Sequence, residues 1–327
     1  MGIKDEYQFD YLDDNQRFAD QVNGALFGGK QIVKPEELES MEPQSVNLEN
    51  RAGKRRTAKT VVDKKRLWNG RKIHILVIEN QNYVDYQMVF RNMLSESIAY
   101  NKQWKQKKAE HERQDDLKKT DEYLSHMKKE EIFTPVITLV VYFGTEHPWD
   151  GAKCLYDLLD IDEDIKSVVS NYRLNLYDCQ AHDTFEEYQT GLRQVFETAR
   201  YAKDKEKLLQ IMEENREVYS RIDSETKEMI EVLVNVKIPE TFQVKEEGEE
   251  RYDMCKAFED MKLEGIEIGL AEGMEKGIEK GIEKGIRALI ETCKELGISR
   301  GVIIEKCMVK FEMTEEKAVA YAAEYGI

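Results

Sequence analysis

The chain has 327 residues, of which 41% are hydrophobic, and this is enough for about two domains with a sizeable core. The longest apolar run, Val136 to Phe143, is interrupted by Thr138 and is much shorter than the roughly 20 residues of a membrane helix. The N-terminal segment carries several acids and lacks the leader pattern of a secreted protein. We therefore expect a cytoplasmic protein without a membrane partner. Five widely spaced cysteines, none in a CxxC pair, argue against a disulfide framework or a structural zinc site.

The net charge of −16 is distributed very unevenly along the chain. Between Arg51 and Lys72, ten lysines and arginines accompany a single acid, Asp63, so this segment carries +9 and the remaining chain −25. A basic segment of this density fits contact with the phosphate backbone of DNA, which requires charge but no base-specific groups. The alternative is a solvated basic loop. The residues expected to contact DNA in this segment are Lys59, Lys64, Lys65 and Arg66.

The first predicted elements are one helix and two strands. Residues 14–27 have helical periodicity that stops at Gly28-Gly29, which indicates a glycine C-cap. Residues 59–67 and 72–80 read as two strands joined around Asn69-Gly70, a strong hairpin signal. Both faces of the second strand are apolar, and this pattern is typical of a central strand covered by helices on both sides.

The pattern then alternates between helix and strand. Tyr86, Val89, Phe90, Met93 and Leu94 follow the period of an amphipathic helix, and a highly charged helical insertion extends over about residues 101–130. Strands are predicted at 135–143 and 172–178, and the pattern becomes helical from about residue 184. This order predicts an α/β fold with a mixed sheet core flanked by helices and a helical C-terminal region.

A tetrapeptide repeat marks the C-terminal part. Between Gly265 and Gly285 a glycine recurs every four residues, each followed by an apolar residue. On a helix these positions form adjacent rows that drift about 40° per step, and a helix so rich in glycine gains most of its stability from packing. We therefore predict a self-association element that makes the chain a homo-oligomer. The predicted division is 1–200, 201–262, a glycine-repeat helix at 263–286, and a small helical unit at 287–327 with Ser299 and Thr314 as N-caps.

The candidate chemistry lies around the second strand. Residues i and i+2 of a strand point to the same face, so Glu79 and Gln81 share one side at the carboxyl end of the strand. Asp63 from the neighbouring strand can complete a pair of carboxylates, which suits Mg²⁺ and the polarisation of a phosphate. The alternative is a solvated strand end and a surface aspartate among lysines.

The pattern of Asp63 followed by Glu79 and Gln81 resembles the PD-(D/E)XK nuclease signature in the variant with glutamine at the third position. Other segments resemble the recombination-promoting nuclease and transposase family that carries this signature: 26–30, 135–144, Pro148-Trp149-Asp150-Gly151, 172–176 and the glycine-rich tail. The resemblance covers nearly the whole chain. It implies a restriction-endonuclease-like core over about residues 1–200 and Mg²⁺-dependent cleavage of DNA, associated with recombination or transposition.

Within this resemblance, Asp63 and Glu79 are the expected metal ligands, and Gln81 is the residue expected to place the attacking water. A further acid commonly comes from the first helix of such nucleases, and Asp20 is the best match. Gln87 and Arg91 are one turn apart on the following helix, where they can reach DNA or remain on a solvated flank. Two departures leave other functions open, because Val62 replaces a common proline and Gln81 lacks the charge of lysine.

Because of these departures, a function from another class stays open. The chain would then be a catalytically inactive protein that binds DNA or associates with itself and retains the nuclease fold. A third possibility is a nuclease that cleaves RNA, because the sequence does not distinguish RNA from DNA as the substrate.

The hairpin makes a geometric prediction. A regular two-residue loop at Asn69-Gly70 would place Asp63 on the face opposite to Glu79, whereas a three-residue loop at 69–71 pairs Trp68 with Lys72 and puts both acids on one face. A shared metal site therefore requires a loop of odd length or a bulge between residues 63 and 79.

Overall fold

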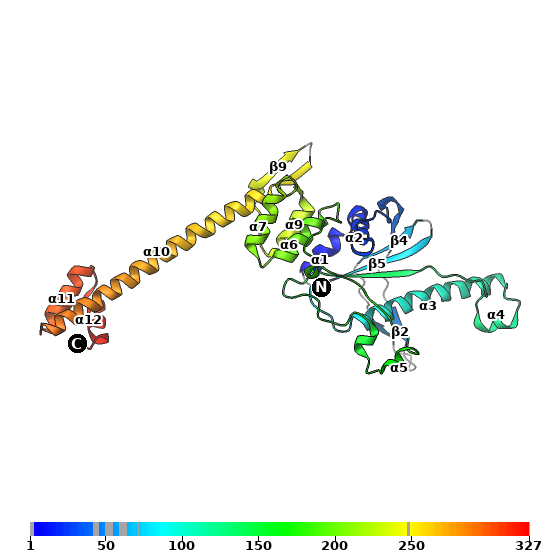
Figure 1. Ribbon diagram of the computed structural model, residues 1–327, viewed down its shortest axis with the longest axis horizontal. Helices are drawn as coiled ribbons and strands as arrows, with labels where there is room; N and C mark the ends of the chain where they lie inside the picture. Colours follow the sequence, from blue (N-terminus) through cyan, green and yellow to red (C-terminus); the bar gives the residue numbers. More distant parts are fainter. Residues whose placement is uncertain are drawn as a thin grey trace. The chain divides into compact units, whose positions relative to one another are not determined.

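The computed structural model describes residues 3–41, 46–49, 55–58, 64–70, 72–246 and 249–326. Its central element is a five-stranded mixed sheet with the strand order β1-β4-β5-β6-β7 (Figure 1). β1 and β4 pair antiparallel, as do β4 and β5, whereas β5, β6 and β7 are parallel. The strands are β1 (Leu38–Ser40), β4 (Lys64–Asn69), β5 (Ile73–Gln81), β6 (Val136–Tyr142) and β7 (Asn175–Asp178). The predicted mixed α/β sheet is thereby confirmed.

The connection between β4 and β5 has the predicted odd length. Asn69 pairs with Ile73, so three residues, 70–72, separate the two strands. The loop lies one residue further along the chain than predicted, because Trp68 pairs with His74 instead of Lys72. In this register odd-numbered residues of β4 share a face with odd-numbered residues of β5, as a site shared by residues 63 and 79 requires. Asp63 itself lies outside the described residues.

Helices cover both faces of the sheet, as the two apolar faces of β5 predicted. On one face Ile75 and Val77 pack with Val136 and with Ala99 of α3 (Met88–Gln114). On the other face Lys64 and Arg66 reach the rings of Phe9 and Phe18. Those rings belong to α1 (Ile3–Tyr11) and α2 (Asn15–Phe27), which lie on the opposite side of the sheet from α3 (Figure 1).

The glycine C-cap predicted for α2 is confirmed, and an aspartate caps its start. The Asp14 side chain accepts a hydrogen bond from the backbone N–H of Arg17, and Gly28 ends the helix with a positive φ of 58°. The buried face of α3 differs from the prediction, since Tyr86, Phe90 and Leu94 are exposed while Met88, Val89 and Asn92 are buried. The amphipathic pattern therefore identified the helix but assigned part of its buried face incorrectly.

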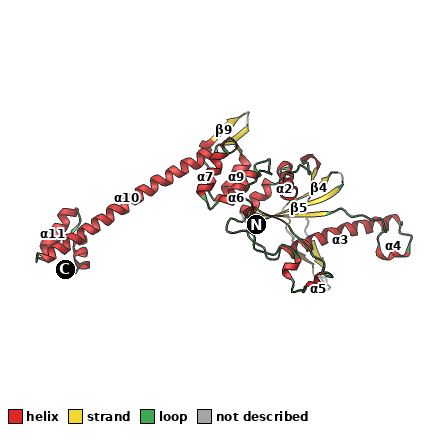
Figure 2. Cartoon of the chain, in the orientation of Figure 1, coloured by secondary structure: helices red, strands yellow, loops and turns green. Residues whose placement is uncertain are grey.

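The larger of two compact units comprises residues 1–257 and holds the remaining elements before the C-terminal unit (Figure 2). Two further small sheets were not predicted: β2 (Val46–Glu49) with β3 (Arg55–Ala58), and β8 (Ile222–Asp223) with β10 (Glu249–Tyr252) and β9 (Gln243–Glu246). The helices are α4 (Thr120–Ser125), α5 (Glu163–Lys166), α6 (Leu192–Tyr201), α7 (Lys205–Glu214), α8 (Arg216–Tyr219) and α9 (Ser224–Val234). Short 3₁₀ turns occur at Pro35–Glu37, Leu155–Leu158, Cys179–Ala181 and Glu240–Phe242.

The charged insertion consists of the second half of α3 and the short helix α4, and His111 bonds to residues at both ends of the segment that contains α4. α3 ends at Asp115, whose φ is 46°, and α4 follows after a short turn. His111 bridges two carboxylates: Nδ1 lies 2.7 Å from Asp116 Oδ1 and Nε2 lies 2.7 Å from Glu131 Oε2. The hydrogen bond to Glu131 raises the pKa of His111 most and burial lowers it, and with the hydrogen bond to Asp116 and the charges of both carboxylates the pKa lies above its usual value. The imidazolium therefore ties the start and the end of the insertion together.

We expect the insertion to loosen as the pH rises. A histidine whose pKa is raised on folding stabilises the folded form fully below its unfolded pKa of about 6.5, and this contribution is lost as the pH rises through the folded pKa. Amide hydrogen exchange of residues 112–131, corrected for intrinsic rates, should show protection that falls over that pH window. The variant His111→Gln should lack this pH dependence. Equal pH dependence in both proteins would contradict the bridging role.

The second unit, residues 258–327, contains most of the long helix α10 (Met254–Glu295), followed by α11 (Arg300–Phe311) and α12 (Glu315–Glu324). Ile286, Ile290 and Cys293 of α10 pack with Ile303 and Cys307 of α11. Ser299 and Thr314 occupy the predicted N-cap positions, and the Thr314 side chain accepts a hydrogen bond from the N–H of Lys317.

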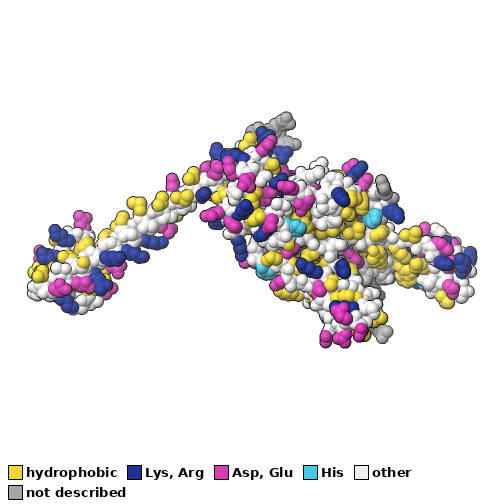
Figure 3. Space-filling model, in the orientation of Figure 1, with side chains coloured by type: hydrophobic (Ala, Val, Ile, Leu, Met, Phe, Trp, Pro, Cys, Tyr) yellow, Lys and Arg dark blue, Asp and Glu magenta, His cyan; other side chains and the backbone are white. Residues whose placement is uncertain are grey.

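The glycine repeat lies on α10 before this small core. Its apolar row is exposed: the exposed fraction is 62% for Leu270, 67% for Met274 and 61% for Ile278. Figure 3 shows hydrophobic side chains along one side of α10 and lysine and arginine side chains along another. Of the helices in the described residues, α10 included, none combines the length and the apolar character that crossing a membrane requires.

Candidate functional site

Glu79 occupies the carboxyl end of β5 and is 1% exposed. Its register partner on β6 is Val140, which packs with Met88 and Tyr142 in an apolar cluster on the α3 side of the sheet. A carboxylate buried among apolar side chains costs several kcal/mol unless charged or hydrogen-bonding groups face it. Burial of Glu79 therefore costs folding free energy, and the groups around its carboxylate indicate the role of the charge.

Arg91 on the first turn of α3 provides one such group. Its Nη2 lies 3.4 Å from Glu79 Oε2, and its Nη1 lies 2.5 Å from Asp85 Oδ2. Asp85 also accepts a hydrogen bond of 2.8 Å from the backbone N–H of Gln87, so it fixes the turn that precedes α3. Gln87 is exposed in this turn. The structure thus brings together three of the predicted site residues, Glu79, Gln87 and Arg91, through Asp85.

A polar stripe continues along the sheet-facing side of α3. Met88 packs with Val140 and Ala99 packs with Val77, so Asn92 and Glu96, at steps of four residues from Met88, face the sheet between these two contacts. The Asn92 side chain is fully buried, and its amide has no hydrogen-bond partner among the described residues. A buried amide in this position is a ready ligand or donor for a group that enters the site.

Tyr172 joins the same cluster from the segment before β7. The carboxylate of Glu96 on α3 lies near its hydroxyl and acts on it electrostatically. Burial raises the pKa of Tyr172 above its usual value, and the charges of Glu96 and Glu79 raise it further. Glu79, Glu96 and Tyr172 therefore lie close enough to interact electrostatically. They form an acidic site, and Arg91 contributes a cation beside Glu79.

The segment Pro148-Trp149-Asp150-Gly151 closes the rim of this region. The Trp149 ring packs edge-on against Tyr142, with a centroid distance of 5.4 Å. Its backbone N–H donates to Asp178 at the end of β7, and Asp150 accepts a hydrogen bond from Tyr86. The motif therefore has a structural role beside the carboxyl ends of the parallel strands.

Gln81 is the last residue of β5 and is half-buried. Its register places it on the same face as Glu79, as the strand period predicted. Its backbone carbonyl accepts a hydrogen bond of 2.8 Å from the N–H of Phe143.

Two of the predicted DNA contacts are buried on the opposite face of the sheet. Lys64 Nζ lies 2.8 Å from Asp13 Oδ1 and 3.4 Å from the centroid of the Phe9 ring. Arg66 donates from Nε to Asn15 Oδ1 and from Nη2 to the backbone carbonyl of Asp13. The structure uses these two charges to hold the turn between α1 and α2 against β4.

Lys65, in contrast, lies on the same face of the sheet as Glu79. It pairs with Val77 and is 6% exposed. Burial and the charge of Lys102 on α3 lower the pKa of Lys65 below its usual value. No hydrogen bond or ion pair of its ammonium is seen with the described residues. Lys65 and Lys102 form a local excess of positive charge next to α3.

Asp20 is not brought to Glu79. It accepts hydrogen bonds from the backbone N–H of Gln189 and of Thr190 and from the Thr190 hydroxyl, at 2.7 to 3.0 Å. It belongs to α2, which covers the face opposite to α3. The carboxylate holds the turn that precedes α6.

The remaining candidates, Asp63 and Lys59, lie outside the described residues. Among the described residues, no group of three histidine, cysteine, aspartate or glutamate side chains is arranged to hold a metal ion. A metal site with three such ligands that includes Glu79 would need a side chain from outside the described residues.

Sequence reasoning missed Asn92, Glu96 and Tyr172. The signal for the first two was the four-residue spacing of Met88, Asn92 and Glu96, which places polar residues on a buried helix face. The sequence pattern instead predicted a buried face that includes Phe90 and Leu94, which are exposed. Tyr172 lies outside any regular strand, and its contact with α3 depends on tertiary structure alone.

Comparison with known proteins gives one match. The family model described as "Putative transposase, YhgA-like" matches residues 66–230, which is 165 of the 327 residues. No curated protein and no solved structure shows significant similarity to the chain. The match begins within β4 and ends within α9, and it includes β5, β6, β7, the whole of α3 and the acidic site around Glu79. The chain belongs to the YhgA-like family of putative transposases.

Proposed function

We propose that the chain is a metal-dependent DNA endonuclease whose sheet and flanking helices form a restriction-endonuclease-like core. Family membership indicates a transposition-related function, which requires the breakage of DNA strands. The observation that carries the proposal is Glu79, a fully buried carboxylate at the carboxyl end of a central strand and on the face that α3 covers. An apolar residue would stabilise the fold better at this position, so the charge indicates a chemical role.

The donor set fits a divalent metal. Glu79 offers carboxylate oxygens, and the unsatisfied Asn92 amide on the same face of the sheet offers a neutral oxygen. Mg²⁺ takes oxygen ligands and is commonly held by one or two carboxylates. We assign Asp63 as the second carboxylate, because the register of β4 with β5 has the parity that a shared face requires. A bound Mg²⁺ supplies Lewis acidity toward the phosphate and acidifies water.

The residues of the chain have distinct roles in this proposal. Arg91 holds the Glu79 carboxylate in place and is itself fixed by Asp85. Gln81 orients the attacking water through its amide, which can both donate and accept hydrogen bonds. Gln81 lacks a positive charge, and the cation of Arg91 partly offsets this loss at the site.

The DNA backbone is proposed to approach along the α3 face. Lys59, Gln87 and Arg91 are the predicted contacts that remain, because Lys64 and Arg66 make internal bonds and Lys65 is buried.

The rival function is that of a catalytically inactive protein that binds DNA or associates with itself. It is favoured by Gln81 in place of lysine and by the ion pair that Arg91 already makes with Glu79. We also propose a homo-oligomer through the glycine repeat of α10, because its apolar row is exposed in a single chain.

The decisive experiment uses the full chain and supercoiled plasmid. Nicked or linear DNA should form with Mg²⁺ and should not form with EDTA. A structured RNA incubated under the same conditions separates a DNA-directed from an RNA-directed nuclease. Cleavage that persists in EDTA, or intact plasmid with Mg²⁺ and with Mn²⁺, would overturn the proposal of a metal-dependent nuclease.

A further inference from the structure

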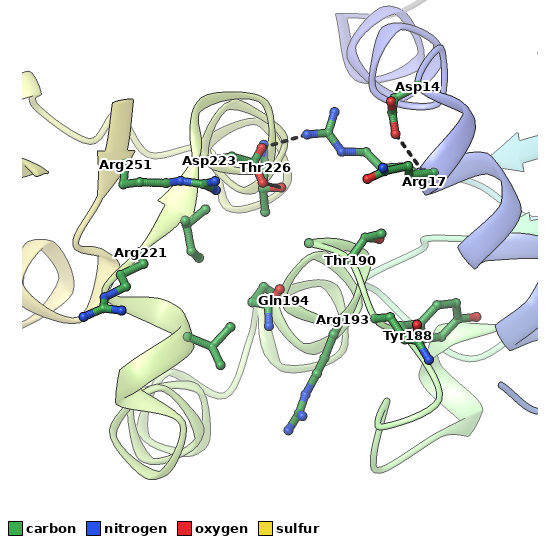
Figure 4. A pocket seen from close by; sticks show the side chains of 15 residues that line it. Asp14, Arg17, Tyr188, Thr190, Arg193, Gln194, Arg221, Asp223, Thr226 and Arg251 are labelled. Carbon is green, nitrogen blue, oxygen red and sulfur yellow. Dashed lines mark hydrogen bonds and ion pairs between the residues drawn. The ribbon is translucent and has the colours of Figure 1, made fainter. Parts of the chain in front are cut away.

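A second candidate binding site lies in the larger unit, apart from Glu79 and Gln81. It is a cavity of about 550 Å³ at the start of α2 and α6 and beside β8, α9 and β10 (Figure 4). We name it the cationic pocket and define it by four arginines and one glutamine: Arg17, Arg193, Arg221, Arg251 and Gln194.

Guanidinium groups outnumber carboxylates in the lining of the pocket. The lining contains four guanidinium groups and two carboxylates, Asp14 and Asp223, and two carboxylates outside the lining, Glu225 and Glu197, pair with Arg17 and Arg193. Both carboxylates already cap helices: Asp14 accepts from the N–H of Arg17 at the start of α2, and Asp223 accepts from the N–H of Thr226 at the start of α9. Their negative charge therefore compensates helix ends in addition to the neighbouring arginines.

Two of the arginines are held in place by carboxylates, which makes the charge arrangement rigid. Arg17 Nη2 lies 2.9 Å from Asp223 Oδ1, and Arg193 Nε lies 3.0 Å from Glu197 Oε1. Arg251 pairs across the β10–β8 ladder with Asp223. In Figure 4, Arg17 and Arg251 approach Asp223 from opposite sides. Rigid guanidinium groups lose little entropy when they bind an anion.

Gln194 is the second, independent indication of a ligand. Its side chain is 5% exposed and lines the pocket, and it has no hydrogen-bond partner among the described residues. Figure 4 shows it on α6, below Asp223 and Thr226 in that view. Its amide is open to the pocket, where a bound ligand with oxygen acceptors can accept its hydrogen bonds.

The start of α6 lies at the pocket, since Thr190 and Gly191 line it. Its first N–H groups already have partners: that of Leu192 donates to the Thr190 hydroxyl and that of Arg193 to the Thr190 carbonyl, while Asp20 accepts from the N–H and the hydroxyl of Thr190. The arginines and Gln194, and not this helix end, therefore carry the anionic preference of the pocket.

We propose that the cationic pocket binds a phosphate monoester of nucleotide size. Guanidinium groups bind phosphate oxygens with two parallel hydrogen bonds, so the arginines and Gln194 recognise the phosphate. A free phosphate ion would fill only a small part of the cavity, whose volume lies within the range of small-molecule sites, roughly 300 to 1,000 Å³. Val218, Ile222 and Tyr188 provide apolar surface for the organic part of the ligand.

The test is calorimetric titration of the full chain in EDTA and at constant ionic strength. The probes are 2′-deoxyadenosine 5′-monophosphate, 2′-deoxyadenosine and a 12-nucleotide DNA strand without a terminal phosphate. The monophosphate should bind saturably with one site per chain, and the nucleoside should not bind. Arg251→Ala and Gln194→Leu should raise the Kd, the former by at least about tenfold. The control Arg216→Ala alters an arginine of α8 outside the pocket and should leave the Kd unchanged.

Gln194→Leu preserves the size of the side chain and keeps the test informative if Arg251→Ala disturbs the β8–β10 pairing. Three outcomes would overturn the proposal: no saturable binding of the monophosphate, equal affinity in Gln194→Leu and Arg216→Ala, or binding of the DNA strand alone. Because EDTA is present, these outcomes are independent of whether the chain is a metal-dependent nuclease.

Discussion

Replacing Glu79 with glutamine is expected to abolish metal-dependent DNA cleavage. Glutamine has the size of glutamate and can still accept a hydrogen bond from Arg91, but it removes the charge that a divalent metal requires. The cleavage rate should fall by at least about 100-fold, which corresponds to about 2.7 kcal/mol in the activation barrier. Asp63→Ala should give a similar loss. The measurement is the initial rate of plasmid nicking at saturating Mg²⁺.

The matched control is Glu110→Gln, which makes the same chemical change at an exposed position on α3. Its rate should equal that of the unaltered protein. Circular dichroism and thermal unfolding should show that Glu79→Gln remains folded, since removing a buried charge does not leave a cavity. A folded Glu79→Gln variant with an undiminished rate would remove Glu79 from the site and favour the inactive DNA-binding function.

The parts of the fold that the sequence predicts are those decided by local pattern. β5 is apolar on both faces, and a strand of this kind has to be central and covered twice. Gly28 and Thr314 stop and start helices through short-range backbone and side-chain chemistry, and both lie where the pattern placed them. The parity of the β4–β5 hairpin was predicted differently, from the hypothesis that residues 63 and 79 share a site, because Asn69-Gly70 alone favours a two-residue loop.

Local pattern could not predict which residues form ion pairs or hydrogen bonds with a buried charged side chain. The basic segment suggested that Lys64 and Arg66 are exposed charges. In the structure they are buried and bond to Asp13 and Asn15, about 50 residues earlier in the chain. Asp20 reads as a spare acid, yet it is committed to the backbone of Gln189 and Thr190, about 170 residues further along the chain. Sequence separation hides such pairs.

The candidate site shows the same division. Glu79 and Gln81 were found because the strand period fixes their common face. Asn92, Glu96 and Tyr172 were not, because the helix has two overlapping apolar patterns and only packing on β6 selects the buried one. The cationic pocket was also missed, since its arginines come from four separate elements and have no common spacing in the chain.

The glycine repeat of α10 is expected to associate two or more copies of the chain. In a single chain, a Cβ added at Gly269, Gly273, Gly277 or Gly281 would meet no atom within 4 Å among the described residues. If the helix were solitary, each Gly→Ala substitution would therefore stabilise it by roughly 0.8 to 1 kcal/mol. If the glycine row lies against another helix, the added methyl groups hold the backbones apart and weaken association. The two arrangements thus predict opposite effects of the same change.

The experiment compares the double variant Gly273→Ala/Gly277→Ala with Gly301→Ala, which adds a methyl group at an equally open position on α11. Light scattering should give the unaltered protein and Gly301→Ala a mass that is a multiple of 38.3 kDa. The double variant should dissociate at higher concentration, as should Met274→Gln/Ile278→Gln, which removes apolar surface from the exposed row. Deletion of residues 265–286 should yield the monomer. A mass of 38.3 kDa for the unaltered protein, with a gain in helix stability for the double variant, would establish that the repeat is a solitary helix.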